Sequence, residues 1–162
     1  MKNIVAKGLI FLCLILLVIA CNTKKTESTV AIDKDQIKKE IQDKEDEFAA
    51  TYNAGEMKSI GYYAEDATTF AQNTSPLVGK VAIVEYLKAN IDSLDKGNKI
   101  SFTTREVFVS NDGIQVVEIG SYNVVDSNNS VVNAGNYMSL FEKRNGRYYS
   151  VRDMSASDGS VK

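Results

Sequence analysis

The sequence predicts an α+β protein in which N-terminal helices pack on a strongly curved, mainly antiparallel sheet. Residues 33 to 53 and 80 to 94 repeat apolar side chains at helical spacing, whereas residues 99 to 154 read as strands between turn residues. Strands joined by short turns pair antiparallel, and helices that precede such a run pack on one face of the sheet. The order of the elements therefore predicts the fold class.

The first helix is expected from Asp33, which suits an N-cap, to about Asn53, where Asn53-Ala54-Gly55 suits the end of a helix. Spacings of four, seven and four residues place its apolar side chains near one face: Ile37, Ile41, Phe48 and Tyr52. We expect its charged side chains to form a solvated surface: Lys38, Lys39, Glu40, Asp43, Lys44, Glu45 and Asp46.

The remaining elements follow from turn residues and from a change of period. Before the sheet we expect a short helix at Glu56 to Tyr63, a strand at Ala67 to Ala71, a loop at Gln72 to Val78 and a helix at Lys80 to about Leu94. The apolar stripe of that last helix is Val81, Val84, Leu87, Ile91 and Leu94. Three turns separate four strands at Lys99 to Ser110, Ile114 to Val125, Val131 to Lys143 and Arg147 to Met154.

The N-terminus carries the pattern of an export signal. Lys2 and Lys7 precede an apolar run from Gly8 to Ala20, which is shorter than the roughly 20 residues of a membrane-spanning helix. The string that ends at Cys21 resembles the lipobox of bacterial lipoproteins. This resemblance implies a signal peptide at 1–20, acyl chains such as palmitate on Cys21, and a protein anchored to a membrane of the bacterial cell envelope. An ordinary secretory signal with a chance cysteine is the alternative.

Composition limits the partners of the mature chain. Residues 21–32 read as the lipidated cysteine and a flexible tether, residues 33–157 as one domain and residues 158–162 as a tail. Losing Lys2 and Lys7 with the signal leaves 17 of the 19 basic residues against 21 acidic ones, a net charge of −4. Nucleic acid is not expected as a partner, because phosphate binding needs a basic face. Cys13 leaves with the signal and Cys21 carries lipid, so no disulfide is expected.

Several short strings, in this order and spacing, resemble the SnoaL-like family of the nuclear transport factor 2-like superfamily. The strings are Phe48 to Glu56, Tyr63 to Ala67, Gly79 to Ile83, Glu118 to Tyr122, Gly135 to Tyr137, Asn145 to Tyr148 and Arg152 to Met154. The resemblance implies a cone-shaped α+β barrel like that of ketosteroid isomerase, with a pocket, and a homodimer formed through the outer sheet face. Unlike much of the family, this chain has no tryptophan.

The residue types restrict the chemistry. The chain has no histidine, which removes Ser/His/Asp and Cys/His catalysis and the commonest metal ligand. Neither a metal nor a cofactor is therefore expected. Any acid–base chemistry must use carboxylates, tyrosines or lysines.

Strand alternation places Glu118 and Tyr122 on one face of the same strand. If that face lines the cone, Glu118 is a candidate general base with Tyr122 as the donor. The alternative is a structural Glu118 that pairs with Arg105 or Arg152 across the sheet. Asp153, near the end of the last strand, is a third candidate catalytic residue, and a salt bridge or turn contact is its alternative.

The abundant aromatic residues predict a core and, in part, a ligand pocket. The proposed pocket residues are Tyr52, Tyr63, Phe70, Tyr137 and Arg152. The expected function is binding of a small, largely apolar ligand in the cone. Two alternatives are a cofactor-free isomerase, cyclase or dehydratase that uses a pocket carboxylate, and a non-catalytic module that dimerises.

Overall fold

The computed structural model describes residues 32–93 and 97–159, and the expected signal peptide, Cys21 and most of the tether lie outside them. Two α-helices pack on one face of a six-stranded curved sheet, as predicted. The elements are α2 (Lys34–Asn53), a 3-10 turn (Met57–Ser59), β1 (Tyr63–Phe70), β2 (Leu77–Val78), α3 (Lys80–Ser93), β3 (Lys99–Val109), β4 (Gln115–Val125), β5 (Val131–Arg144) and β6 (Arg147–Ser157). Among the described residues, no helix is long and apolar enough to cross a bilayer.

The sheet has the order β2-β1-β6-β5-β4-β3. The strands from β3 to β6 are consecutive antiparallel hairpins, and four of the residues in their turns, Gly113, Asn129, Asn145 and Gly146, have positive φ angles. β1 joins the sheet parallel to β6, a pairing that no turn in the sequence predicts. The expected loop before α3 contains the short strand β2, which pairs with β1.

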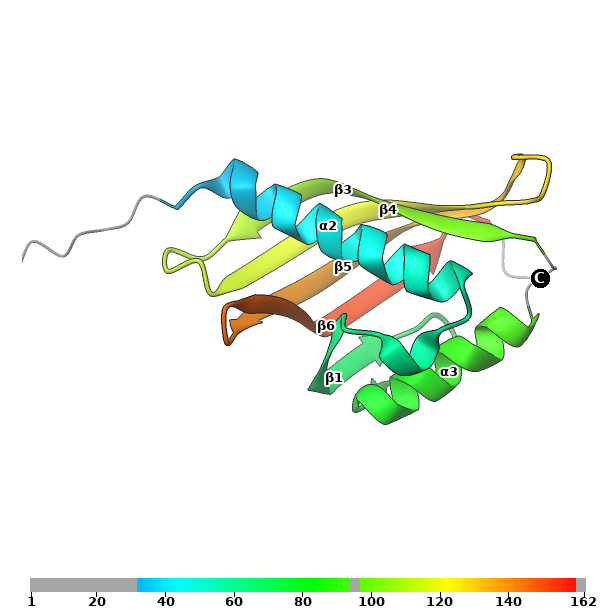
Figure 1. Ribbon diagram of the computed structural model, residues 1–162, viewed down its shortest axis with the longest axis horizontal. Helices are drawn as coiled ribbons and strands as arrows, with labels where there is room; N and C mark the ends of the chain where they lie inside the picture. The colour runs from blue at the N-terminus through cyan, green and yellow to red at the C-terminus, as the bar shows by residue number, and fades with distance from the viewer. Residues whose placement is uncertain (1–31, 94–96, 160–162) are drawn as a thin grey trace, which may run out of the picture. The chain divides into compact units, whose positions relative to one another are not determined.

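Helix α2 lies along β3 and across the sheet, whereas α3 lies beside β1 (Figure 1). Asp33 caps α2 as predicted, because its carboxylate accepts a hydrogen bond from the Gln36 N–H at 3.0 Å. The Gln42 amide bonds the backbone of β3 on both sides, donating to Phe102 O at 3.2 Å and accepting from Thr104 N at 2.8 Å. The Asn53 amide does the same for both backbone groups of Ile100 at 2.9 Å. The helix is thus hydrogen-bonded to the edge of the sheet.

Two glycines allow tyrosine rings to lie flat on the sheet. Gly120 pairs with Tyr137 across β4 and β5, and Gly135 pairs with Tyr122 in the same two strands. A β-carbon at Gly120 would overlap the Tyr137 ring, and one at Gly135 would overlap the Tyr122 ring. The two crossed pairs therefore hold both phenols close to the inner face, which we define as the face toward the helices.

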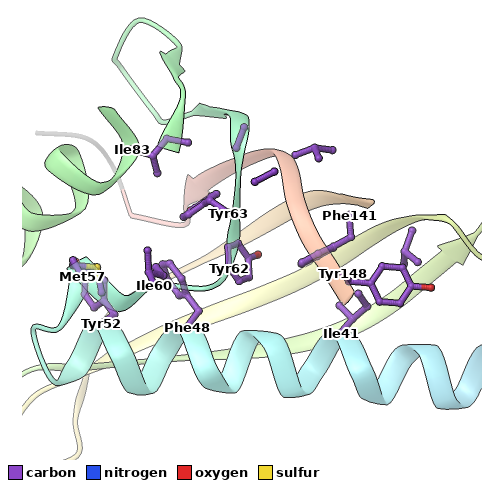
Figure 2. Packing of buried hydrophobic residues seen from close by; sticks show 14 of the residues in the cluster. Ile41, Phe48, Tyr52, Met57, Ile60, Tyr62, Tyr63, Ile83, Phe141 and Tyr148 are labelled. Atoms are coloured by element: carbon purple, nitrogen blue, oxygen red, sulfur yellow. The ribbon is translucent and has the colours of Figure 1, made fainter. Parts of the chain in front are cut away.

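The core lies between this inner face and the helices. Ile41, Phe48 and Tyr52 point from α2 toward Tyr62, Tyr63 and Phe141 of the sheet side (Figure 2). In α3 the buried residue is Ile83, while Val81 is 71% exposed. The predicted apolar stripe of α3 was therefore wrong at Val81, because Ile83 with Val84, Leu87 and Ile91 gives an equally regular helical face that packs on the core.

Candidate functional site

A cavity of about 410 Å³ lies between the inner face of the sheet and the two helices. Eight aromatic rings line its wall: Phe48, Tyr52, Tyr62, Tyr63, Tyr86, Phe102, Tyr122 and Tyr137. Its opening lies at the exposed residues Gln72, Asn133 and Ser155, and its closed end at the buried residues Glu45 and Ser139. A concave space that combines aromatic rings with polar groups that can fix the orientation of a ligand is typical of a small-molecule site.

Glu45 is a buried cavity residue whose predicted position was wrong. It was expected on the solvated face of α2, but its side chain is 1% exposed and lines the cavity. The reason is its position: Glu45 lies four residues after Ile41 and three before Phe48, within the buried face of the helix. Ile41 and Phe48 are seven residues apart, and Glu45 is the residue between them on the same helix face. This gap in the apolar spacing was the signal that a polar residue is buried there.

A hydrogen-bonded network connects Glu45 to the sheet. The Tyr62 hydroxyl donates to Glu45 Oε1 at 2.5 Å and lies 3.3 Å from the Ser139 hydroxyl. Glu118, which is fully buried, accepts hydrogen bonds on Oε1 from Thr104 Oγ1 at 2.6 Å and from Tyr137 Oη at 2.8 Å. The Glu45 and Glu118 carboxyls interact with each other, so α2 and β4 meet through two acidic groups.

Burial and the closeness of the two carboxyls favour one proton held between them. Burial, and then the nearby Glu118 charge, raise the pKa of Glu45 well above its usual range. Burial also raises the pKa of Glu118, although hydrogen bonds from Thr104, Glu45 and Tyr137 oppose that rise. Glu118 Oε2 has no donor among the described residues other than a protonated Glu45. We therefore assign the proton to Glu45, which donates it to Glu118.

Asp153 forms a second polar point on the cavity wall. Its carboxylate accepts hydrogen bonds from Thr69 Oγ1 at 2.5 Å and from Tyr63 Oη at 3.2 Å. Burial raises the pKa of Asp153 to about 6, against the lowering effect of these two bonds. Near neutral pH this carboxyl is mostly ionised but takes up a proton readily.

Glu118 and Tyr122 share the inner face of β4, in agreement with the alternation of the strand. Tyr122 lines the cavity, whereas Glu118 lies behind the lining residues and reaches the cavity through Glu45 and Tyr137. The alternative pairing of Glu118 with Arg105 or Arg152 is wrong. Among the described contacts, Arg105 bonds Ser121 and Arg152 bonds the carbonyl of Asp66.

Three of the proposed pocket residues, Tyr52, Tyr63 and Tyr137, line the cavity, and two do not. Phe70 is 44% exposed and Arg152 is exposed, both on the outer face of the sheet. The placement of these two in the pocket was wrong, because side chains alternate along a strand and their neighbours Thr69 and Asp153 take the inward positions.

The arrangement offers proton donors and acceptors in an apolar space. Protonated Glu45 and the tyrosine hydroxyls can donate, and ionised Asp153 can accept. In the part of the chain that the structure describes, no group of three or more histidine, cysteine, aspartate or glutamate side chains is placed to hold a metal ion.

The sequence matches no family model and none of the curated proteins. Solved structures do match. A nuclear transport factor 2-like protein of unknown function from Shewanella oneidensis MR-1 is 21% identical with a TM-score of 0.58, and the match covers 72% of this chain and 96% of that one. A ketosteroid isomerase-like protein from Erwinia carotovora atroseptica is 14% identical with a TM-score of 0.56, covering 75% and 96%.

A hexachlorocyclohexane dehydrochlorinase from Novosphingobium barchaimii LL02 has a TM-score of 0.64 at 15% identity, with 78% of this chain and 89% of that chain covered. At these identities the likeness establishes the fold and not the activity. The described part of the chain thus has the cone-shaped fold of the nuclear transport factor 2-like superfamily.

Proposed function

We propose that the cavity binds a small, largely apolar molecule that carries one polar group. The observation behind this proposal is the cavity of about 410 Å³, whose wall carries eight aromatic rings and whose closed end holds Glu45 and Ser139. The rings offer contact area to an apolar body, and Glu45, Tyr62 and Asp153 offer hydrogen bonds that fix its polar end.

A bulky side chain at the opening tests this proposal. Ser155 is exposed and lines the cavity, so Ser155→Trp should fill the entrance with little cost to the fold. Its matched control is Ala156→Trp, because Ala156 is the next residue, is also exposed and lies outside the cavity lining. Native mass spectrometry of the protein purified from its own host should find retained ligand in the wild type and in Ala156→Trp, and none in Ser155→Trp. Ligand retained equally in all three proteins, or in none of them, would contradict the proposal.

The second candidate is a cofactor-free isomerase or dehydratase, which the position of Asp153 favours. Its pKa of about 6 suits a general base near neutral pH. Asp153 would remove a proton from a carbon next to a carbonyl, while Glu45 or a tyrosine donates a hydrogen bond to the developing oxyanion. Asp153→Asn should then stop exchange of solvent deuterium into the retained ligand without stopping binding. Unchanged exchange in this variant would exclude Asp153 as the base.

The site is proposed to act in the cell envelope, with the chain held to a membrane through acylated Cys21. Support comes from the sequence alone, because residues 1–31 lie outside those that the structure describes. Cys21→Ser should move the protein from the membrane fraction to the soluble fraction and remove labelled palmitate, whereas Cys13→Ser should do neither. Membrane association that survives Cys21→Ser would contradict this part.

The outer face of the sheet is proposed to pair with a second copy of the chain. Phe70, Met154 and Met138 lie side by side in register across β1, β6 and β5, and they are 44%, 54% and 44% exposed. A contiguous apolar row of this kind marks an interaction surface. Sedimentation of the soluble domain should show a dimer, and Met138→Glu should give a monomer. A monomeric wild type would rule out the pairing.

A further inference from the structure

The charges around the cavity are of one sign. Glu45 and Asp153 line it, Glu118 lies directly behind, and none of the lining residues is lysine or arginine. None of these three carboxyls belongs to an ion pair among the described residues. Buried carboxyls normally have a cationic partner, because the unpaired charge is costly. A ligand could supply the partner that the chain lacks.

One buried acceptor also lacks a donor of its own. Glu118 is fully buried, and its Oε2 has no hydrogen-bond partner from the chain unless Glu45 carries a proton. The carboxyl pair therefore depends on one proton for its stability. A positive group that approaches Glu45 from the cavity would remove the need for that proton.

The rings of the wall suit a cation as well. Phe48, Phe102 and Tyr137 form a connected edge-to-face cluster, with centroids 5.4 Å apart for Phe48 and Phe102 and 5.5 Å apart for Phe102 and Tyr137. Tyr122 lies beside this cluster, 6.4 Å from Phe102. Faces of such rings attract ammonium groups within about 6 Å, and the attraction is strongest where water is excluded.

From the unpaired carboxyls, the orphaned acceptor and the aromatic wall, we infer that the ligand is an organic cation, a protonated amine on an apolar body. This inference rests on the proposed binding function and specifies its ligand class. The ammonium group lies at the closed end, between Glu45 and Asp153, and the apolar body lies among the rings toward the opening. The same charge pattern disfavours carboxylates and phosphates.

Binding of the amine displaces the shared proton. Glu45 releases its proton to solvent as the ammonium takes its place, so one positive charge replaces another. The groups that face Asp153 are the Tyr63 hydroxyl of β1 and the Glu45 carboxyl of α2. The groups that face Glu45 are the Glu118 carboxyl of β4 and the Tyr62 hydroxyl. All the acidic groups in this set favour the cation when ionised, so affinity should rise with pH as Asp153 and Glu45 ionise.

Three probes with one apolar body and different charges test the inference. Phenylbutylamine, phenylbutanol and phenylbutyrate are titrated against the soluble domain by calorimetry at neutral pH. We expect the amine to bind at least about ten-fold more tightly than the alcohol, and the carboxylate to bind most weakly. An alcohol that binds as tightly as the amine, or a carboxylate that binds best, overturns the cation inference but leaves the proposed function standing. Binding of none of the three overturns both.

Charge-removing variants identify the carboxyls that cause the preference for the amine. Glu45→Gln and Asp153→Asn keep the shape and hydrogen-bonding capacity of the side chain and remove its charge, so each should reduce the preference for amine over alcohol several-fold. Glu106→Gln, an exposed carboxyl on the outer face, is the control and should leave that preference unchanged.

Two buffers with different ionisation enthalpies measure the displaced proton. We expect the amine to release up to one proton and the alcohol to release none, with the release lost in Glu45→Gln. Equal proton release for amine and alcohol would contradict the displacement.

Discussion

The two faces of the sheet each carry exceptions to the usual pattern of a sheet with one covered side: polar groups are buried within the core face, and large apolar side chains are exposed on the other. The inner face buries Glu118, Ser139 and Ser150, whose side chains are at most 1% exposed. The outer face exposes Phe70, Met138 and Met154 instead. Antiparallel sheets usually place apolar side chains toward the core and polar ones toward water.

This difference shows that the inner face is not built for stability alone. Each buried carboxyl costs free energy that an apolar residue would not. The aromatic cluster around Phe48, with rings from Tyr62, Tyr63 and Phe102 at centroid distances of 4.9, 6.1 and 5.4 Å, supplies the stabilising contacts beside the polar groups. The inner face thus combines a core with a polar site, and the outer face keeps apolar groups available for a partner.

The largest loss of stability on changing one face of the sheet is expected from Gly120→Ala on the inner face. The added methyl group overlaps the Tyr137 ring, which must leave the inner face and break its hydrogen bond to Glu118. We expect a loss of about 3 kcal/mol in the free energy of unfolding, measured by urea denaturation. Ile119→Val, at the adjacent outward position of β4, should cost less than about 1.5 kcal/mol. Similar losses for both variants would mean that the two faces tolerate change equally.

The pH dependence of stability is expected to come from the inner face. The folded state keeps protons on Glu45 and Asp153 at pH values where the unfolded chain has released them. The free energy of unfolding should therefore fall as pH rises above 3.8, the ordinary pKa of an aspartate, and the share from Asp153 should be lost by about pH 6 to 7.

Urea denaturation at about pH 5 and about pH 8 should show a fall of about 2 kcal/mol in the wild type. The fall should be smaller in Glu45→Gln and unchanged in Glu106→Gln, the exposed carboxyl of the outer face. Stability that is constant over this interval would show that the buried carboxyls are ionised in both states.

A smaller effect is expected from Tyr62→Phe. The hydroxyl of Tyr62 donates to Glu45 at 2.5 Å, and its removal leaves a buried acceptor short of one donor. We expect a loss of about 1 to 2 kcal/mol in thermal or urea unfolding. Tyr149→Phe, at a half-buried position of β6 outside the cavity lining, is the matched control and should change stability by less than about 0.5 kcal/mol. Equal losses of stability in the two variants would show that the hydrogen bond from Tyr62 to Glu45 contributes nothing to the stability of the fold.

The smallest effect on folding is expected from Met138→Glu on the outer face. Met138 is 44% exposed, so the monomer should lose less than about 0.5 kcal/mol at low protein concentration. The variant should nevertheless lose the dependence of the melting temperature on protein concentration that a dimer shows. A large loss of stability in the monomer would mean that Met138 packs on the core.

Much of the fold could be predicted because its signals are local. The hairpins follow from turn residues such as Asn111-Asp112-Gly113, and α2 follows from Asp33 and its apolar spacing. The parallel pairing of β1 with β6 depends on contacts between residues far apart in sequence, for which a turn gives no signal. The inward or outward direction of Phe70 and Arg152 depends on that same register.

The site was predicted only in part for a related reason. Tyr52, Tyr63, Tyr137, Tyr122 and Asp153 line the cavity as the sequence suggested. Glu45 looked like one member of a charged run, and only the helix face that it shares with Ile41 and Phe48 separates it from its neighbours. Its pairing with Glu118 requires α2 to lie over β4 in one register, which no local pattern encodes.

The hydrogen bonds that Gln42 and Asn53 make to β3 have a consequence for the behaviour of many copies together. They occupy backbone groups of the edge strand that would otherwise accept a strand from a neighbouring molecule. At the opposite edge, β2 has only two residues and offers little to extend. At high protein concentration, neighbouring copies therefore find few free backbone groups at either sheet edge with which to pair strands and form fibrils, even though apolar side chains are exposed between the two edges.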